Sequence, residues 1–282
     1  MDVGTFKDYV KSMDSLGKPL PTPMPLTHVT GSKSFEKILN DGHLMPQTCS
    51  FLGQNLVYCF YGRAAYRPIP EGLKKKKHAQ PSHLPACILL DGDKLPKRSG
   101  QYPFDSGAFL SKRFKGLLLG STGGGVETLK PYELHDDPGC PGRCVFAFYE
   151  NNDDYFHEQP RDQLIKESTC GEVSNYHDML KTRISNHIDD RAMTFEIRFD
   201  QPIPLDDKTV IKIVLPQIWK HARRDYIFKR LEELNLKTKV VFYSTTLGNY
   251  QEHAGALHQK VADILSNLGI LPTDADRMSQ VY

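Results

Sequence analysis

Hydrophobic residues that alternate with polar ones, or recur at helical spacing, divide the chain into short predicted elements. An apolar run reaches from residue 25 to His28, and Phe35, Ile38 and Leu39 then recur at helical spacing before Gly42. This pattern predicts a strand that ends at His28 and a helix over residues 34–41 that Gly42 terminates. A polar ring at the end of a buried strand, directly before a helix, needs a structural or functional explanation.

Similar patterns predict further elements downstream. Aromatic and β-branched runs predict strands over residues 55–62, 85–90, 192–199, 210–216 and 239–243. Helical periodicity predicts helices over residues 217–234 and 250–268. Glycine, proline and acidic residues fill residues 120–174, where we expect long irregular loops and one strand over residues 144–149. This mixed order of strands and helices predicts an α+β fold.

The same patterns predict three parts of the chain. The prolines between residues 18 and 25 indicate an extended lead-in over residues 1–24. A strand-rich core follows over residues 25–215, and we expect a C-terminal α/β extension, residues 216–282, to pack on it.

Composition and charge narrow the class of protein. The chain has 282 residues, of which 39% are hydrophobic and 25% charged, and a formal net charge of +2. This composition is typical of a globular protein. A net charge of +2 gives no overall positive potential that would attract nucleic acid, so any basic surface is local, at "LKKKKH" or "KHARRDYIFKR". A solvated face is the ordinary interpretation of such runs. No apolar run is long enough to cross a membrane and the N-terminus is unlike a signal peptide, so we expect a soluble, cytoplasmic protein.

The cysteines do not predict a metal centre. Of the six cysteines, only the two in "CPGRC" are close together, and no second pair or histidine cluster completes a zinc-like set. Scattered thiols fit a reducing compartment.

Glu196 lies within an otherwise apolar predicted strand. Thr194, Glu196 and Arg198 share one face of this strand, and the apolar residues between them share the other. A polar strand face is either exposed to solvent or part of a functional site. The ordinary alternatives are a solvated edge strand for Glu196 and a core or cap position for His28.

Three motifs in a fixed order resemble those of a known family. They are "THVTGSKSFEKILNDGHL", "VYCFYGRAAY" and "FEIRFDQPIPLDDKTVIKIVLP", within residues 25–216. Their order resembles the H-Y-E-type arrangement of ADP-ribosyltransferases, and most of all the DarT-like enzymes that modify nucleic acids. The resemblance implies an ADP-ribosyltransferase-like split β-sheet core with flanking helices, and NAD as co-substrate.

The resemblance also implies roles for individual residues. His28 would bond a ribose hydroxyl of NAD, and the backbone of Val29 and Thr30 would hold the nicotinamide carboxamide. Glu196 would be catalytic, because a carboxylate can stabilise the oxocarbenium-like ribose and accept the proton of the nucleophile. Arg63 would be the second catalytic residue, holding the pyrophosphate or polarising the acceptor base with its planar fork.

The remaining predicted NAD-binding residues are two tyrosines and a serine. Tyr61 and Tyr66 lie within the second motif, and Tyr66 would stack on the nicotinamide or on the acceptor. Ser106 lies in "PFDSGAF", for which an ordinary Asx-type turn is the alternative. Arg191, in "HIDDRA", would touch the acceptor, although a solvated salt bridge is an equal interpretation.

The acceptor is inferred from a departure from the family pattern. Transferases that modify arginine resemble one another in a second acid two residues before the catalytic glutamate, where this chain has Thr194. We therefore expect the acceptor to be a base in single-stranded DNA or RNA, and the protein to act as a toxin or phage-defence effector with a neutralising antitoxin partner. The alternatives are an NAD glycohydrolase, a protein ADP-ribosyltransferase, or a non-catalytic module that binds nucleic acid or a partner.

Overall fold

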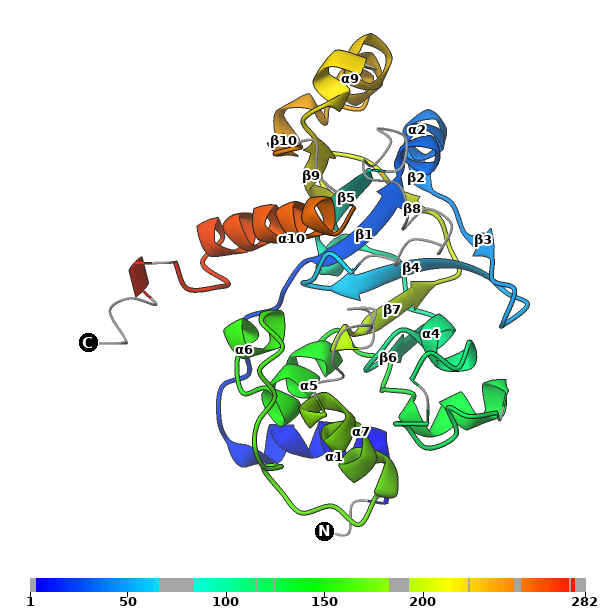
Figure 1. Ribbon diagram of the computed structural model, residues 1–282, viewed down its shortest axis with the longest axis vertical. Coiled ribbons are helices and arrows are strands. Elements are labelled where there is room, and N and C mark those ends of the chain that lie inside the picture. The colour runs from blue at the N-terminus through cyan, green and yellow to red at the C-terminus, as the bar shows by residue number, and fades with distance from the viewer. Residues whose placement is uncertain are drawn as a thin grey trace.

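A central, mostly antiparallel β-sheet organises the protein in the computed structural model (Figure 1). The structure describes residues 4–65, 84–114, 116–123, 125–182, 193–222, 224–245, 250–273 and 275–276. The strand order is β10-β9-β5-β1-β4-β7-β6, with β3 paired to β4, and β2 and β8 form a separate two-stranded sheet. In chain order the strands are β1 (Leu26–Gly31), β2 (His43–Leu44), β3 (Gln47–Thr48), β4 (Asn55–Tyr61), β5 (Pro85–Leu90), β6 (Gly100–Tyr102), β7 (Glu196–Phe199), β8 (Ile203–Pro204), β9 (Val210–Pro216) and β10 (Val240–Tyr243).

The sequence explains which strands lie at the centre. All six residues of β5 are buried, as its uninterrupted apolar run predicts for a strand covered on both faces. β5 pairs antiparallel with β1 and β9, and β4 pairs antiparallel with β1 and β7. The mixed fold with a mostly antiparallel sheet confirms the α+β class in its general form.

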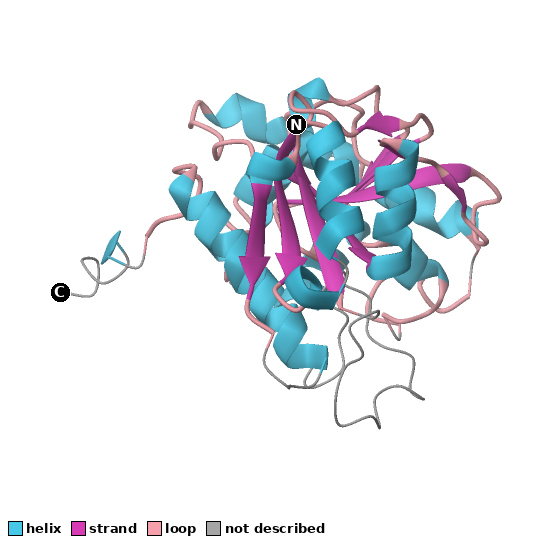
Figure 2. Cartoon of the chain, turned by 90° about the horizontal axis from the view of Figure 1, so that it is seen from above, coloured by secondary structure: helices cyan, strands magenta, loops and turns pink. Residues whose placement is uncertain are grey.

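Helices pack around this sheet (Figure 2). α2 contacts β1 and β5, and α10 contacts β5, β9 and β10. A second group, α1, α5 and α7, packs together below the sheet in Figure 1. The helices are α1 (Phe6–Lys11), α2 (Ser32–Asp41), α4 (Ser106–Leu110), α5 (Cys140–Phe148), α6 (Asn152–Phe156), α7 (Gly171–Lys181), α8 (Trp219–Ala222), α9 (Arg224–Glu233) and α10 (Tyr250–Asn267), with 3-10 turns η1 (Ser12–Leu16), η3 (Gly92–Lys94), η4 (Val126–Tyr132) and η6 (Lys237–Lys239).

Several predictions about the local structure were wrong. The strand predicted to end at His28 continues to Gly31 as β1. The predicted lead-in contains α1 and η1, whose residues Phe6, Tyr9 and Met13 are fully buried. The predicted strand over residues 144–149 is mostly the helix α5, and every residue of α5 is buried. A helix enclosed on all sides loses its polar stripe, so its sequence resembles that of a buried strand. The segment predicted as loops also contains η4, α6 and part of α7.

The C-terminal part continues the same sheet. β10 pairs parallel to β9, with Val240 opposite Ile213 and Tyr243 opposite Pro216. Within the predicted helix over residues 217–234, the described residues 219–222 and 224–233 are helical, as α8 and α9. None of the described helices is both long and apolar enough to cross a membrane.

Candidate functional site

The strands β1 and β4 form a fork at the centre of the sheet. They pair at two positions, Leu26 with Tyr61 and Thr27 with Phe60. Beyond Thr27, β1 continues its pairing with β5, while β4 continues its pairing with β7. Figure 1 shows the two strands close together at one end and diverging toward the other. His28 is the first residue of β1 after the last pair.

His28 bridges the two strands where they separate. Its Nδ1 lies 2.9 Å from the backbone oxygen of Tyr58 on β4. A carbonyl oxygen can only accept, so Nδ1 carries the hydrogen and, in the neutral ring, Nε2 keeps its lone pair. Burial lowers the pKa of His28, and the bond to Tyr58 offsets this only in part. The ring is therefore neutral at pH 7 and offers Nε2 as a hydrogen-bond acceptor, which suits a hydroxyl ligand.

Glu196 begins β7 and is enclosed by its neighbours. It lies opposite Phe60 of β4 and Tyr102 of β6, and only 1% of its surface is exposed. Ser106, the first residue of α4, donates to the carboxylate twice, from its backbone N–H at 3.0 Å and from its hydroxyl at 2.6 Å. The Nε of Arg198 lies 3.5 Å from Oε1 of Glu196.

The surroundings of Glu196 raise the pKa of its carboxyl group toward neutral pH. Burial is the main cause that raises its pKa from the ordinary 4.5 to about 8, and the negative charge of Asp105 adds to it. Arg198 and the two bonds from Ser106 act in the opposite direction. A carboxyl group with a pKa near the working pH can both take and return a proton, which is what a general acid–base requires.

Tyr58 connects the His28 and Glu196 positions. Its carbonyl oxygen accepts the bond from His28, and it lies opposite Arg198 on β7. The pKa of its phenol is raised mainly by burial, then by Cys49 and by the charge of Glu196. Two of the predicted site positions, 168 residues apart in the sequence, thus share one neighbour.

Arg63 lies beside the closed end of the fork, but its guanidinium faces elsewhere. Its carbonyl oxygen accepts a hydrogen bond from the hydroxyl of Thr27, next to His28. Its buried guanidinium pairs with Glu158, and its Cζ lies 6.0 Å from the ring centre of Tyr155. In this arrangement Arg63 holds the end of β4 against the segment that follows α6.

The other predicted residues lie in several environments. Val29 and Thr30 are half-buried on β1, opposite Cys87 and Ala86 of β5. The ring of Tyr61 is buried, and its hydroxyl accepts a hydrogen bond of 3.0 Å from the backbone N–H of Met24. Tyr61 therefore packs in the core between segments distant in sequence. Tyr66, Arg191 and the run "LKKKKH" lie outside the described residues.

Several neighbours of Glu196 were not singled out from the sequence as members of its site. Asp105 accepts a bond of 2.6 Å from the N–H of Ala108 and so caps α4, which is the Asx-type turn expected there. That turn also presents Ser106 to Glu196. The Asx-type turn is therefore confirmed, while the NAD-binding role of Ser106 stays a prediction. Arg198 was recognisable from the shared strand face, whereas Tyr58 and Tyr102 depend on strand register.

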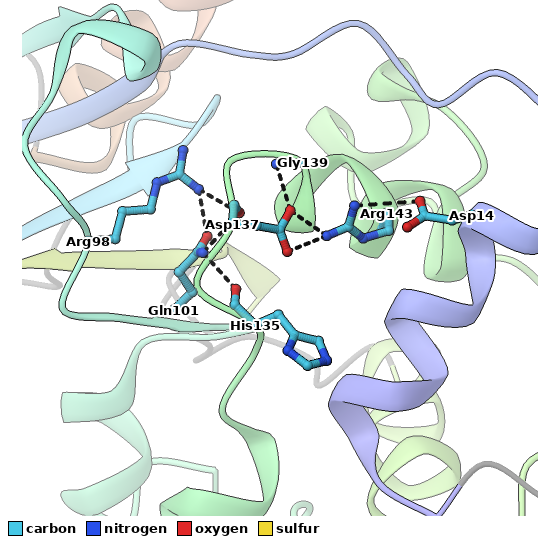
Figure 3. A network of polar contacts seen from close by, with 7 residues as sticks. All are labelled: Asp14, Arg98, Gln101, His135, Asp137, Gly139 and Arg143. Carbon is cyan, nitrogen blue, oxygen red and sulfur yellow. Dashed lines mark hydrogen bonds and ion pairs between the residues drawn. The ribbon is translucent and has the colours of Figure 1, made fainter.

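A second network of polar contacts joins parts of the fold outside the candidate site (Figure 3). Gln101 of β6 donates to the backbone oxygen of His135 at 2.8 Å and accepts from Arg98 at 2.8 Å. Arg143 of α5 pairs with Asp137 and lies 3.5 Å from Asp14 of η1. These contacts tie the sheet edge to α5 and to the N-terminal turn. Among the described residues, no group of three or more His, Cys, Asp and Glu side chains is arranged to hold a metal ion.

Comparison with known proteins adds no relative, because no protein-family model, no curated protein and no solved structure matches the chain.

Proposed function

We propose that the protein is an NAD-dependent mono-ADP-ribosyltransferase. The observation that carries the proposal is the adjacency of the three motif strands. β1 with His28, β4 with its following Arg63, and β7 with Glu196 are consecutive in the sheet, although they come from distant parts of the sequence. The motif resemblance leads us to expect this adjacency, and the fork between β1 and β4 supports the proposal of a split sheet.

His28 is proposed to bind the ribose of NAD. A ribose hydroxyl would donate to Nε2, which the bond from Nδ1 to Tyr58 keeps unprotonated. The backbone of Val29 and Thr30 would hold the nicotinamide carboxamide. A fixed neutral ring suits this task because a protonated one would have no acceptor.

Glu196 is proposed to act on the reacting sugar. The bond between nicotinamide and the anomeric carbon breaks, and its electron pair leaves with nicotinamide, whose ring becomes neutral. An acceptor nitrogen then bonds the anomeric carbon, and its proton passes to the carboxylate of Glu196. The same carboxylate stabilises the positive charge that develops on the ribose. Its raised pKa of about 8 suits the proton transfer.

Arg63 is proposed to hold the pyrophosphate or to polarise the acceptor base. Its guanidinium pairs with Glu158 in this structure, so binding of NAD would exchange that carboxylate for a phosphate. The proposal includes Tyr66 and Ser106 as residues of the NAD site, whereas Tyr61 is buried in the core and is not part of it. Ser106 contributes through its two hydrogen bonds to Glu196.

The proposed acceptor is a base in single-stranded DNA or RNA. Thr194, two residues before Glu196, is fully buried and provides no second acid. An arginine acceptor would need such an acid by family resemblance, whereas a nucleobase nitrogen needs less help. A base must be unpaired to reach an enclosed carboxylate, which favours single strands. Such an activity in the cytoplasm would be toxic, so the proposed biology is a toxin or phage-defence effector with a neutralising partner.

The test is a labelling experiment with NAD that carries label on its adenylate. The protein is incubated with single-stranded DNA, single-stranded RNA or a protein extract, and each pool is then digested with nuclease or protease. The proposal expects label that nuclease releases from one nucleic acid. Glu196→Gln should abolish labelling, and Glu127→Gln, at an exposed glutamate paired with Lys130, is the matched control.

Each of the other outcomes would indicate a different function for this protein. Label that only protease releases would replace the nucleic-acid acceptor by a protein. Free ADP-ribose without a labelled macromolecule would identify an NAD glycohydrolase. No consumption of NAD in any pool would leave the non-catalytic binding module as the remaining interpretation.

A further inference from the structure

We infer that Arg198 is a positioning residue for Glu196, and that Gly100 exists to make room for its guanidinium. The inference rests on the proposed function for its meaning in catalysis. Its geometry, however, is independent of the substrate, and so is the measurement that tests it.

The first step is the placement of Arg198 on the same strand face. Residues two apart on a strand point to the same side, so Arg198 extends beside Glu196 on β7. Its Nε lies 3.5 Å from Oε1 of Glu196, and the two side chains are 6% and 1% exposed. Within the described part of the chain this Nε has no hydrogen-bond partner. The guanidinium therefore interacts with Glu196 as a buried neighbouring charge.

The second step is the support that β6 gives to the guanidinium. Gly100 and Tyr102 of β6 lie opposite Arg198 and Glu196 respectively. The Cζ of Arg198 lies 4.2 Å from the ring centre of Tyr102, a cation–π contact. A Cβ atom at Gly100 would come within 2.9 Å of Nη2 of Arg198. A glycine at this position thus leaves the space against β6 that the guanidinium occupies.

The third step is the charge balance around Glu196. The groups around Glu196 come from four elements: Ser106 and its preceding cap residue Asp105 from the start of α4, Tyr58 from β4, Tyr102 from β6 and Arg198 from β7. Burial and Asp105 favour the protonated carboxyl, whereas Arg198 and Ser106 favour the carboxylate. With Arg198 present, the pKa of Glu196 is about 8. Without this charge, burial and the second acid would raise the pKa further and lower the carboxylate fraction at neutral pH. Arg198 therefore determines how much of the reactive carboxylate exists at the working pH.

The test measures the titration of Glu196 directly. Protein with ¹³C-labelled glutamate is titrated by NMR, and the Glu196 signal is assigned by its loss in Glu196→Gln. We expect an apparent pKa near 8 in the unchanged protein. In Arg198→Met it should rise by about one unit or more, which lowers the carboxylate fraction at pH 7 about tenfold per unit. Arg198→Lys should recover part of the shift, because it restores the charge without the planar fork.

Gly100→Ala tests the same idea without removing any polar group. The added methyl meets the far end of a flexible side chain, so the guanidinium moves while the fold is retained. The Glu196 pKa should rise, by less than in Arg198→Met, and the pH profile of NAD cleavage should shift in parallel. This variant carries the test if Arg198→Met does not fold.

The matched control is Arg143→Lys, which alters the pair between a mostly buried arginine and the partly exposed Asp137, in the network of Figure 3. It should leave the Glu196 titration unchanged. The inference is overturned if Arg198→Met or Gly100→Ala leaves that titration where it was. This readout decides the role of Arg198 whether or not NAD is consumed, so it fails or succeeds separately from the transferase proposal.

Discussion

A buried glutamate on a central strand makes folding sensitive to pH. The folded protein holds the proton of Glu196 up to about pH 8, whereas the unfolded chain releases it near 4.5. Between these values the unfolded state binds fewer protons than the folded state, so the free energy of unfolding falls as pH rises. Below pH 4.5 both states are protonated, and this contribution to stability is fully present.

Glu196→Gln should therefore become more stable relative to the unchanged protein as pH rises. The amide does not titrate, so the penalty that grows between pH 4.5 and 8 is absent. We expect the difference in the free energy of unfolding to change by a few kcal/mol, about 1.4 kcal/mol per unit at most. Denaturant unfolding at pH 5 and at pH 8 measures it. An equal difference at both pH values would contradict the raised pKa.

The histidine at the fork should show a single neutral tautomer. Because Nδ1 donates to the oxygen of Tyr58, ¹⁵N NMR of His28 should report hydrogen on Nδ1 and a free Nε2 from pH 6.5 to 8. Its pKa should lie below the ordinary 6.5, as burial requires. His28→Ala should weaken NAD binding and leave the Glu196 titration nearly unchanged. A ring with hydrogen on Nε2 would remove the proposed acceptor for the ribose hydroxyl.

Sequence patterns singled out some residues of the candidate site and missed others for a definite reason. His28 and Glu196 stand out because each interrupts an apolar run with a polar side chain. Asp105 and Tyr58 have ordinary local explanations, a helix cap and a strand aromatic. Their proximity to Glu196 depends on the register of three strands, which the sequence does not specify residue by residue.

At the scale of elements, the strands were easier to predict than the helices around them. The runs that became β1, β4, β5, β9 and β10 have the length and bulk typical of strands. α5 was predicted as a strand because all its residues are buried and it shows no polar face. α1 was missed because a six-residue helix has too few turns for a clear period. Tertiary packing, rather than local pattern, determines both helices.

The N-terminal helix should contribute strongly to stability. Phe6 is fully buried and packs against Tyr132, Phe148 and Tyr176, with ring centres 5.8, 5.7 and 5.5 Å away. Phe6→Ala should cost about 3–5 kcal/mol of unfolding free energy, because it leaves a cavity in this aromatic cluster. Lys7→Ala, on the exposed side of the same helix, is the control and should have little effect. A small cost for Phe6→Ala would restore the extended lead-in as the better description.

At the scale of the whole molecule, the sheet joins the parts that the sequence analysis separated. The predicted core ends at residue 215, but β9 continues through it and pairs with β10 of the predicted extension. α10 covers β5, β9 and β10 together, and buries Leu257, Val261 and Leu265. Removing the C-terminal part would expose both an unpaired strand edge and the apolar face beneath α10. The extension is thus needed to complete the core.

A protein built in this way should unfold in one cooperative step. Its single tryptophan, Trp219, belongs to the C-terminal part but is buried 5.9 Å from the ring of Phe35 in α2. Tryptophan fluorescence therefore reports the joint between the two parts, while far-ultraviolet circular dichroism reports the whole fold. Both signals should give the same denaturant midpoint and slope, as a two-state transition requires. Phe6→Ala should shift both midpoints together, although Phe6 lies at the other end of the chain. A fluorescence transition at lower denaturant than the dichroism transition would show that residues 216–282 come away from a core that stays folded.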